Sequence, residues 1–459
     1  MLRYGFSRFC VTPAPDCRVS LAGYFNKRWQ EGKIDDIYVY AMLVADEHEV
    51  VALCQADSVS VPLPLAERIR SGCRDIVGLK PENIVVCATH SHTCPALMQG
   101  DLPIDCSVDD DSKQVATDTG SNPAYDNFLV EQAVKAIHAA YADLRPSQAY
   151  YGECEDSRWA YCRRYWMKDN TVVTNPRRQD PNIAKAEGPI DPRIGIFGLK
   201  NEDGSWRFLM ANISNHPDTV EGNLVCADWC GVVRSVLEKE LPGCLTMSLT
   251  APQGNVNHFN VYGPEQQSGY ERITRRMGEG YAESVLAALP KMRKLADGPL
   301  KALHLSPKVP ARQVAEEEIE RAREHAAKYE FDENMTLTSE DLAKGAPHAL
   351  KFFADQLLSI VDDNSERELP VWGWKLGELY LISLPGEPFI EHGMYIREDL
   401  LQRKPCLITA LAMSRLGYIP NRYNFGRGGY ETTVLGSPTC IEAGNLLRET
   451  AAELIAKLG

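Results

Sequence analysis

Two histidines with a spacing suited to chemistry, His90 and His92, follow a short apolar run and precede Cys94-Pro95. The run, residues 83–88, is rich in β-branched side chains and predicts a buried strand. Because side chains alternate along a strand, both imidazoles are expected on one face if the chain stays extended through them. Such a pair could supply a metal ligand beside a proton-transfer group. A polar loop that carries two histidines by coincidence explains the stretch equally well, so distant partners must decide.

Other predicted strands also end in a polar residue beside proline or glycine. These are His216-Pro217, Gly386-Glu387 and Gly417-Tyr418, after strands expected at 206–213, 378–384 and 407–412. Catalytic groups commonly lie on loops at strand ends, because the sheet fixes their positions. Two histidines and a glutamate could form a catalytic zinc site with one coordination position left open for water. Each of these turns, taken alone, is more often structural.

The remaining sequence alternates predicted strands and helices, which indicates an α/β protein. Further strands are expected at 37–44, 50–54, 147–152, 194–199, 244–249, 300–308 and 370–374, and helices at 62–77, 127–144, 228–241, 270–290 and 440–457. The polar stretch 100–123 and the helical region 312–362 are expected to be excursions from the main fold. Since no repeat or linker marks a boundary, one domain over residues 1–459 is expected.

Composition excludes several functional classes. The 459 residues carry 63 acidic and 49 basic side chains, a net charge of −14, which argues against nucleic-acid binding and against attraction to anionic membranes. The sequence has no run of 18 apolar residues and no signal-peptide pattern at its start, so a cytoplasmic protein without membrane insertion is expected. The 14 cysteines are scattered, which is typical of reduced, mostly buried thiols.

A dense cationic and aromatic segment lies between Ser157 and Pro176. Its members are Arg158, Trp159, Tyr161, Arg163, Arg164, Tyr165 and Trp166. In an acidic protein this segment could bind an anion or a carbonyl group in a cleft, or it could simply pack along an edge strand.

Several motifs, in this order along the chain, resemble those of one enzyme family. They are Leu21-Ala22-Gly23-Tyr24, Ala56-Asp57, Thr89-His90-Ser91-His92, Asn215-His216-Pro217, Ala227-Asp228-Trp229, Gln253-Gly254-Asn255-Val256, Pro385-Gly386-Glu387 and Gly417-Tyr418. With them the sequence resembles the catalytic domain of the neutral/alkaline ceramidases, zinc amidases that cleave N-acyl-sphingosine. The resemblance runs from Gly5-Phe6-Ser7 through the C-terminal helix. It implies layered sheets flanked by helices, an αββα-like arrangement.

The resemblance also implies roles for individual residues. The zinc ligands would be His90, His216, Glu387 and Tyr418. His92 would be the general acid/base, while Tyr430 and Arg163 would stabilise the oxyanion. Arg164, directly after Arg163, leaves the register of the active-site arginine open.

The chain departs from the family in one loop. Where the family carries Asp followed by Ser-Pro, this sequence has Asn255, Asn257 and His258. The missing serine favours attack by a metal-bound water over an acyl-enzyme, or else indicates a changed substrate pocket. Asn257, His258 and Arg164 are candidate substrate-binding residues, although a purely structural role explains His258 equally well.

Either Asp57 or Asp228 could orient a ligand histidine, although a role as helix cap explains Asp228 at least as well. The chain also ends soon after the catalytic part, without the C-terminal domain of ceramidases, which argues against a membrane lipid as substrate.

We therefore predict a zinc-dependent hydrolase that cleaves an amide (N-acyl) bond in a small, polar molecule by attack of a metal-bound water. One alternative is a metallohydrolase or lyase that acts on an ester, lactone or sugar derivative. Another is a non-catalytic binding protein of the same fold. The expected partner is a small-molecule substrate, and a homo-oligomer stays open.

Overall fold

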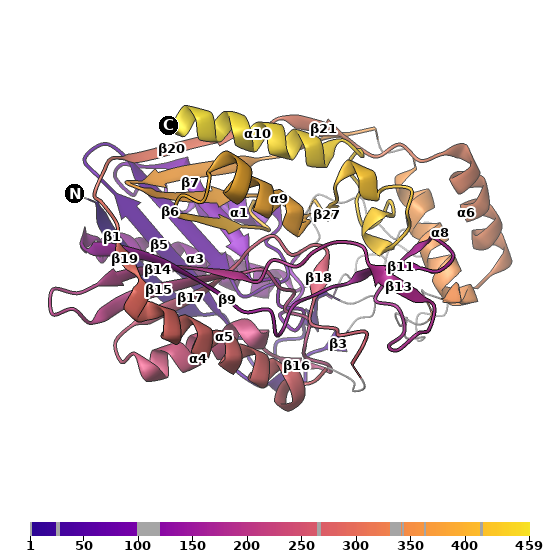
Figure 1. Cartoon of the computed structure of the whole chain (residues 1–459), viewed down its shortest axis with the longest axis horizontal. Helices are drawn as coiled ribbons and strands as arrows, with labels where there is room; N and C mark the ends of the chain where they lie inside the picture. The colour runs from indigo at the N-terminus through magenta and orange to yellow at the C-terminus, as the bar shows by residue number, and fades with distance from the viewer. Residues whose placement is uncertain are drawn as a thin grey trace.

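Three sheets organise the computed structural model, which describes residues 2–23, 28–98, 120–263, 268–330, 341, 344–361, 364–413 and 416–459 (Figure 1). The first sheet has the order β7-β6-β5-β1-β8. Its strands are β1 (Arg3–Cys10), β5 (Tyr38–Ala45), β6 (Val50–Ala56), β7 (Leu79–Ala88) and β8 (Arg145–Pro146). The predicted hairpin of β5 and β6 is confirmed as an antiparallel pair, whereas β6 and β7 run parallel.

The second sheet has the order β17-β15-β14-β9-β19. It contains β9 (Gln148–Glu155), β14 (Arg193–Lys200), β15 (Trp206–Ile213), β17 (Leu245–Thr250) and β19 (Arg293–Lys294). The third sheet has the order β20-β23-β24-β26, with β20 (Leu300–Leu305), β23 (Val371–Leu376), β24 (Leu379–Ser383) and β26 (Cys406–Thr409).

Each sheet contains one parallel pair whose strands are joined by a helical crossover. The pairs are β6/β7, β15/β17 and β24/β26. Their crossovers contain α1 (Leu63–Ser71), α4 (Asp228–Glu240) and α9 (Ile390–Tyr395), which runs on into η3 (Ile396–Leu400). In a parallel pair the carboxyl ends of both strands lie at the same edge of the sheet, so the loops that follow can meet there.

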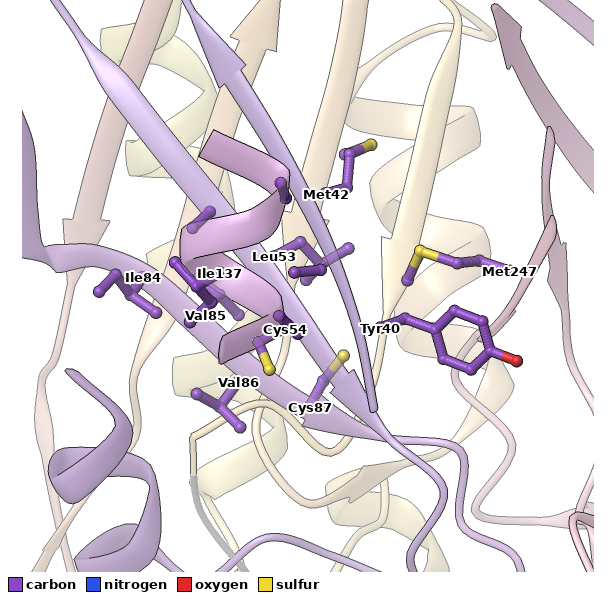
Figure 2. Close-up of a cluster of buried hydrophobic side chains, with 14 of the residues drawn as sticks. Tyr40, Met42, Leu53, Cys54, Ile84, Val85, Val86, Cys87, Ile137 and Met247 are labelled. Carbon is purple, nitrogen blue, oxygen red and sulfur yellow. The ribbon is translucent and has the colours of Figure 1, made fainter. Parts of the chain in front are cut away.

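Helices cover the outer faces of these sheets (Figure 1). Helices α1 and α3 (Pro123–Ala142) cover the first sheet, α4 and α5 (Arg275–Ala288) the second, and α10 (Ala443–Leu458) the third. The largest apolar core covers both faces of the first sheet and reaches the other two sheets, and Figure 2 shows side chains of β5, β6 and β7 in it with Ile137 of α3 and Met247 of β17. Strand β6 is buried at every position because it is covered on both faces. The expected layered α/β fold is confirmed.

Shorter elements complete the described chain. The strands are β2 (Ser20–Leu21), β3 (Arg28–Trp29), β4 (Gly32–Lys33), β10 (Tyr161–Cys162), β11 (Arg164–Met167), β12 (Val172–Thr174), β13 (Ile183–Ala186), β16 (Leu224–Val225), β18 (Val256–Asn257), β21 (Lys308–Pro310), β22 (Glu366–Glu368), β25 (Glu387–Pro388) and β27 (Tyr418–Ile419). The helical turns are η1 (Tyr270–Thr274), η2 (Leu289–Lys291), η4 (Arg422–Asn424) and η5 (Tyr430–Thr432).

Two predicted helix boundaries were wrong. The helix expected over 62–77 ends at Ser71, where Gly72 lies so close to Val134 of α3 that a Cβ would stand 2.6 Å from its Cγ2. The helix expected over 127–144 begins at Pro123, because the side chain of Asn122 caps it by accepting a hydrogen bond from the backbone N–H of Ala124.

The two predicted excursions are described only in part. Residues 100–119 of the first, which was predicted over 100–123, lie outside the described residues. The second contains α6 (Glu316–Lys328) and α8 (Pro347–Ile360), which pack on each other. In the part of the chain that the structure describes, no helix is long and apolar enough to cross a membrane. The cysteines within the described ranges are free thiols, as expected.

Candidate metal centre

Three buried threonines join the carboxyl ends of the parallel pairs. The Thr250 hydroxyl donates to the carbonyl oxygen of Thr89 at 2.8 Å, and the Thr409 hydroxyl donates to the carbonyl oxygen of Thr250 at 3.2 Å. Thr250 and Thr409 end β17 and β26, and Thr89 follows β7. The three sheets therefore meet at one point, and the loops after this point carry the predicted site residues.

The chain does not stay extended through His90 and His92, so the geometric reason given for their proximity was wrong. Strand β7 ends at Ala88, and His90 has a φ of +72°, in the left-handed region that a residue with a side chain rarely adopts. The two rings nevertheless lie together, with centroids 4.9 Å apart. With His216 they form a group whose nitrogen atoms lie within 4.8 Å of one another and could hold a metal ion.

Backbone carbonyls orient two of these imidazoles. His90 Nδ1 lies 2.7 Å from the carbonyl oxygen of Val59, and His216 Nδ1 lies 3.0 Å from that of Val256. Because a carbonyl oxygen only accepts, each Nδ1 carries the hydrogen, and in the neutral ring each Nε2 then presents a lone pair. Both Nε2 atoms lie 3.2 Å from Oε2 of Glu387.

This arrangement fits a bound cation. His90 Nε2 and Glu387 Oε2 are buried atoms that make no hydrogen bond, although each is a strong acceptor. Acceptors that face one another in a buried site need a positive charge between them. Two imidazole nitrogens and a carboxylate oxygen are a donor set that suits zinc.

The pKa shifts reflect the same cluster. Burial opposes protonation of His90, but the adjacent Glu387 carboxylate outweighs it and raises the pKa of His90. Burial also opposes ionisation of Glu387, yet His90 and His216 hold its pKa well below the usual range. Burial and the neighbouring His90 lower the pKa of His92, which therefore stays neutral and able to accept a proton.

The Ala227-Asp228-Trp229 motif fixes the loop that carries His216. Trp229 Nε1 donates to the carbonyl oxygen of His216 at 3.1 Å. The Asp228 carboxylate accepts from the backbone N–H and the hydroxyl of Thr219, at 2.9 and 2.6 Å. Asp228 is the first residue of α4 and Ala227 is the N-cap.

Asp57, the other carboxylate considered for this role, pairs with Arg234 at 2.7 and 2.9 Å. The prediction that either carboxylate orients a ligand histidine directly is therefore wrong, since Val59 and Val256 do so.

Glu387 and Tyr418 come together because their two short strands, β25 and β27, pair in parallel with these residues in register. The Tyr418 ring lies 6.4 Å from the His216 ring and 5.8 Å from the Tyr430 ring, between centroids. Burial raises the pKa of Tyr418 well above its usual value. Four distant segments thus place both tyrosines beside the histidine and glutamate cluster.

The structure separates the two arginines of the cationic segment. Arg163 lies with Nη1 3.4 Å from His216 Nε2 and with Cζ 4.8 Å from the centroid of Tyr418. Arg164 is fully buried and donates to Glu187, Glu431 and the carbonyl oxygen of Gly428. Arg163 therefore faces the site, whereas these contacts give no support to a substrate-binding role for Arg164.

The loop in which the sequence departs from the family, with Asn257 and His258, contains one half of a residue pair that the sequence did not predict. His258 Nδ1 lies 3.0 Å from Oδ1 of Asp218, two residues after His216, while His258 Nε2 is buried without a hydrogen-bond partner. Asn257 instead uses its amide group locally, donating to Asn175 Oδ1 at 2.9 Å and accepting from the backbone N–H of Phe259 at 3.0 Å. An Asp after His-Pro was visible in the sequence, but nothing there indicated its partner.

Comparison with solved structures identifies the architecture. The neutral ceramidase from Pseudomonas aeruginosa superposes with a TM-score of 0.72 at 16% sequence identity, covering 100% of this chain and 75% of that chain. A structure described as ceramidase complexed with C2 gives 0.71 at 15% identity, with the same coverage. The chain has a neutral ceramidase-like fold. The search against protein-family models and the search of curated proteins return no match.

At this identity the ceramidase-like fold confirms the expected architecture and leaves the roles of individual residues as predictions. The metal ligands predicted at His90, His216, Glu387 and Tyr418 lie together in this fold. His92 belongs to the same group, and Arg163 and Tyr430 border it.

Proposed function

We propose that this protein is a zinc-dependent hydrolase that cleaves an amide bond in a small molecule. One observation carries the proposal: three buried acceptor atoms point toward one another within a ceramidase-like fold. They are His90 Nε2, His216 Nε2 and Glu387 Oε2. His90, His216 and Glu387 would hold the metal, with Tyr418 as the fourth ligand that the family resemblance suggests. Bound there, zinc would polarise the amide carbonyl and lower the pKa of a water molecule to about 7.

The remaining groups have distinct tasks in this proposal. His92, kept neutral by burial, takes a proton from the attacking water and returns it to the leaving nitrogen. Arg163 and Tyr430 donate hydrogen bonds to the oxygen on which negative charge develops. An amide needs both kinds of help, because its carbonyl is a weak electrophile and its amine is a poor leaving group.

We propose that the substrate carries a polar group and an apolar acyl group, because polar and aromatic side chains both lie near the cluster. The polar pair of His258 and Asp218 follows His216 on one side. On another side, the ring of Phe353 from α8 lies 6.4 Å from that of Tyr430. We therefore propose small N-acyl compounds, including N-acyl amino acids, as the first substrates to test, with ceramide beside them.

The test combines metal analysis with an activity screen. The zinc-loaded protein is assayed against N-acyl amino acids, N-acyl amines, ceramides, esters and lactones, and the His90→Ala variant serves as the control. We expect about one zinc per chain, amide turnover by the wild type, and loss of both in the variant. A wild-type protein that binds no metal, or that turns over only esters or lactones, overturns the proposal.

A further inference from the structure

A single buried carboxylate holds two consecutive arginines beside the site. Glu431 Oε1 accepts from Arg163 Nε at 2.5 Å, and Glu431 Oε2 accepts from Arg164 Nη1 at 2.7 Å. The Thr174 hydroxyl donates to the same Oε2 at 2.7 Å. The side chains of Glu431 and Arg164 are fully buried, and that of Arg163 is 6% exposed.

The ion pair with Glu431 determines which edge of the Arg163 guanidinium faces the site. A guanidinium is planar, so a carboxylate bound at Nε fixes the plane and leaves the Nη atoms for another acceptor. In this structure Arg163 Nη1 lies 3.4 Å from His216 Nε2, and Cζ stands over the Tyr418 ring. Without this partner the arginine side chain could take many rotamers, and its guanidinium would no longer be held toward the site.

The charged network around Glu431 contains more guanidinium groups than carboxylates. Glu187 binds Arg164, with Oε2 2.5 Å from Nε, and its Oε1 lies 3.3 Å from Nη1 of Arg427. The connected network thus has three guanidinium groups, those of Arg163, Arg164 and Arg427, and two carboxylates. One positive charge stays unbalanced within it. Burial opposes ionisation of Glu431, but Arg163 and Arg164 lower its pKa to about 2, so the carboxylate stays charged.

We propose that Glu431 is the positioning residue for Arg163, holding its guanidinium so that the Nη edge meets the oxygen on which charge develops during hydrolysis. This inference rests on the proposed function. It accounts for the separation of the neighbouring arginines: both Glu431 and Glu187 bind Arg164 in the interior, whereas of these two carboxylates Glu431 is the one that binds Arg163.

The matched pair Glu431→Gln and Glu187→Gln separates positioning from stability. Each variant removes one buried carboxylate charge from the same network, but Glu187 contacts Arg164 and not Arg163. For Glu431→Gln we expect kcat to fall about 10²-fold, the size of the loss of an oxyanion donor, with KM changed less than about threefold. For Glu187→Gln we expect a lower thermal midpoint with kcat within about threefold of wild type. Equal losses of kcat in both variants, or unchanged kcat in Glu431→Gln, overturn the inference.

A milder variant covers the case in which Glu431→Gln does not fold. Thr174→Val keeps every charge but removes two hydrogen bonds of the Thr174 hydroxyl, the one donated to Glu431 Oε2 and the one accepted from the backbone N–H of Tyr430. A fall in kcat of about threefold to tenfold is expected with zinc content unchanged, and a shift of the Arg163 guanidinium in the crystal structure assigns it to Glu431. Unchanged kcat in Thr174→Val, if Glu431→Gln does not fold, overturns the inference.

Crystal structures of the variants give a readout that does not depend on activity. We expect the Arg163 guanidinium to leave the Tyr418 ring in Glu431→Gln, or to shift from it in Thr174→Val, and to stay over it in Glu187→Gln. If the wild type cleaves no amide, the proposed function fails, while the structures still test the positioning. An Arg163 that stays over Tyr418 without Glu431 overturns it.

Discussion

Gly23 lies against the imidazole of His92 with no room for a side chain. Its φ is +93°, and a Cβ there would stand 2.5 Å from Cγ of His92. In Gly23→Ala the imidazole must move, so we expect kcat to fall about 10²-fold or more, the contribution of a general acid/base, while zinc content stays near wild type. The measurements are kcat and zinc per chain.

Gly222→Ala is the matched control for this prediction. Gly222 has a similar φ of +88°, but a Cβ there would meet open space. The two variants therefore share the backbone strain and differ in the contact with His92. A similar fall in kcat in both would show that strain, and not displacement of His92, causes the loss.

The low pKa of Glu431 predicts how the stability of the protein depends on pH. Its folded-state pKa of about 2 lies below the ordinary 4.5 of glutamate, because Arg163 and Arg164 stabilise the charge against burial. The folded state therefore gains stability from this carboxylate above pH 4.5 and loses that gain as the pH falls toward 2. The difference in unfolding free energy between wild type and Glu431→Gln should be constant from about pH 5 to 7 and shrink below pH 4.5. Urea unfolding of the metal-free proteins at these pH values measures it, and a difference that does not change with pH contradicts the assignment.

Among the elements, β17 contacts a ligand loop without contributing a predicted ligand. Its last residue, Thr250, donates to the carbonyl oxygen of Thr89, which directly precedes His90. Thr250→Val leaves that buried oxygen without this donor, so we expect a loss of about 1–3 kcal/mol of stability and weaker zinc binding. Chemical denaturation and zinc titration measure the two effects.

The same strand supplies a control at its other end. The hydroxyl of Thr246 donates to the carbonyl oxygen of Arg234 at 3.2 Å, near the end of β17 that lies away from Thr250 and the metal cluster. Thr246→Val should therefore lower stability and leave zinc affinity unchanged. If both variants bind zinc as tightly as wild type, the threonine contacts do not position His90.

Strand ends followed by a polar residue were visible in the sequence, and for this reason His90, His216 and Glu387 could be singled out. The left-handed turn at His90 could not, because it depends on contacts with other segments, such as the bond from its N–H to the carbonyl oxygen of Ser58. The carbonyl partners of the histidines also leave no signal, since every residue type has a backbone oxygen. Choosing Arg163 over Arg164 required Glu431, which is 268 residues away.

For the molecule as a whole, the predicted ligands lie where three sheets meet. His90 follows β7, His216 follows β15 and Glu387 follows β24, so a metal ion held by all three would link the sheets. A ligand that binds only the folded state stabilises it by about 4 kcal/mol at 1,000 times its dissociation constant. Removing zinc should therefore lower the thermal midpoint and loosen the three loops together.

Hydrogen exchange can follow this coupling segment by segment. On chelation we expect faster exchange at 86–92, 213–219 and 384–390 at once, since losing one bridging ion frees all three loops. Helix α6, on the far side of the α6–α8 excursion, should exchange unchanged (Figure 1). In His90→Ala, chelator should have no further effect on any segment. If only one of the loops responds, the ion does not join the three sheets and the ligand set proposed here is incorrect.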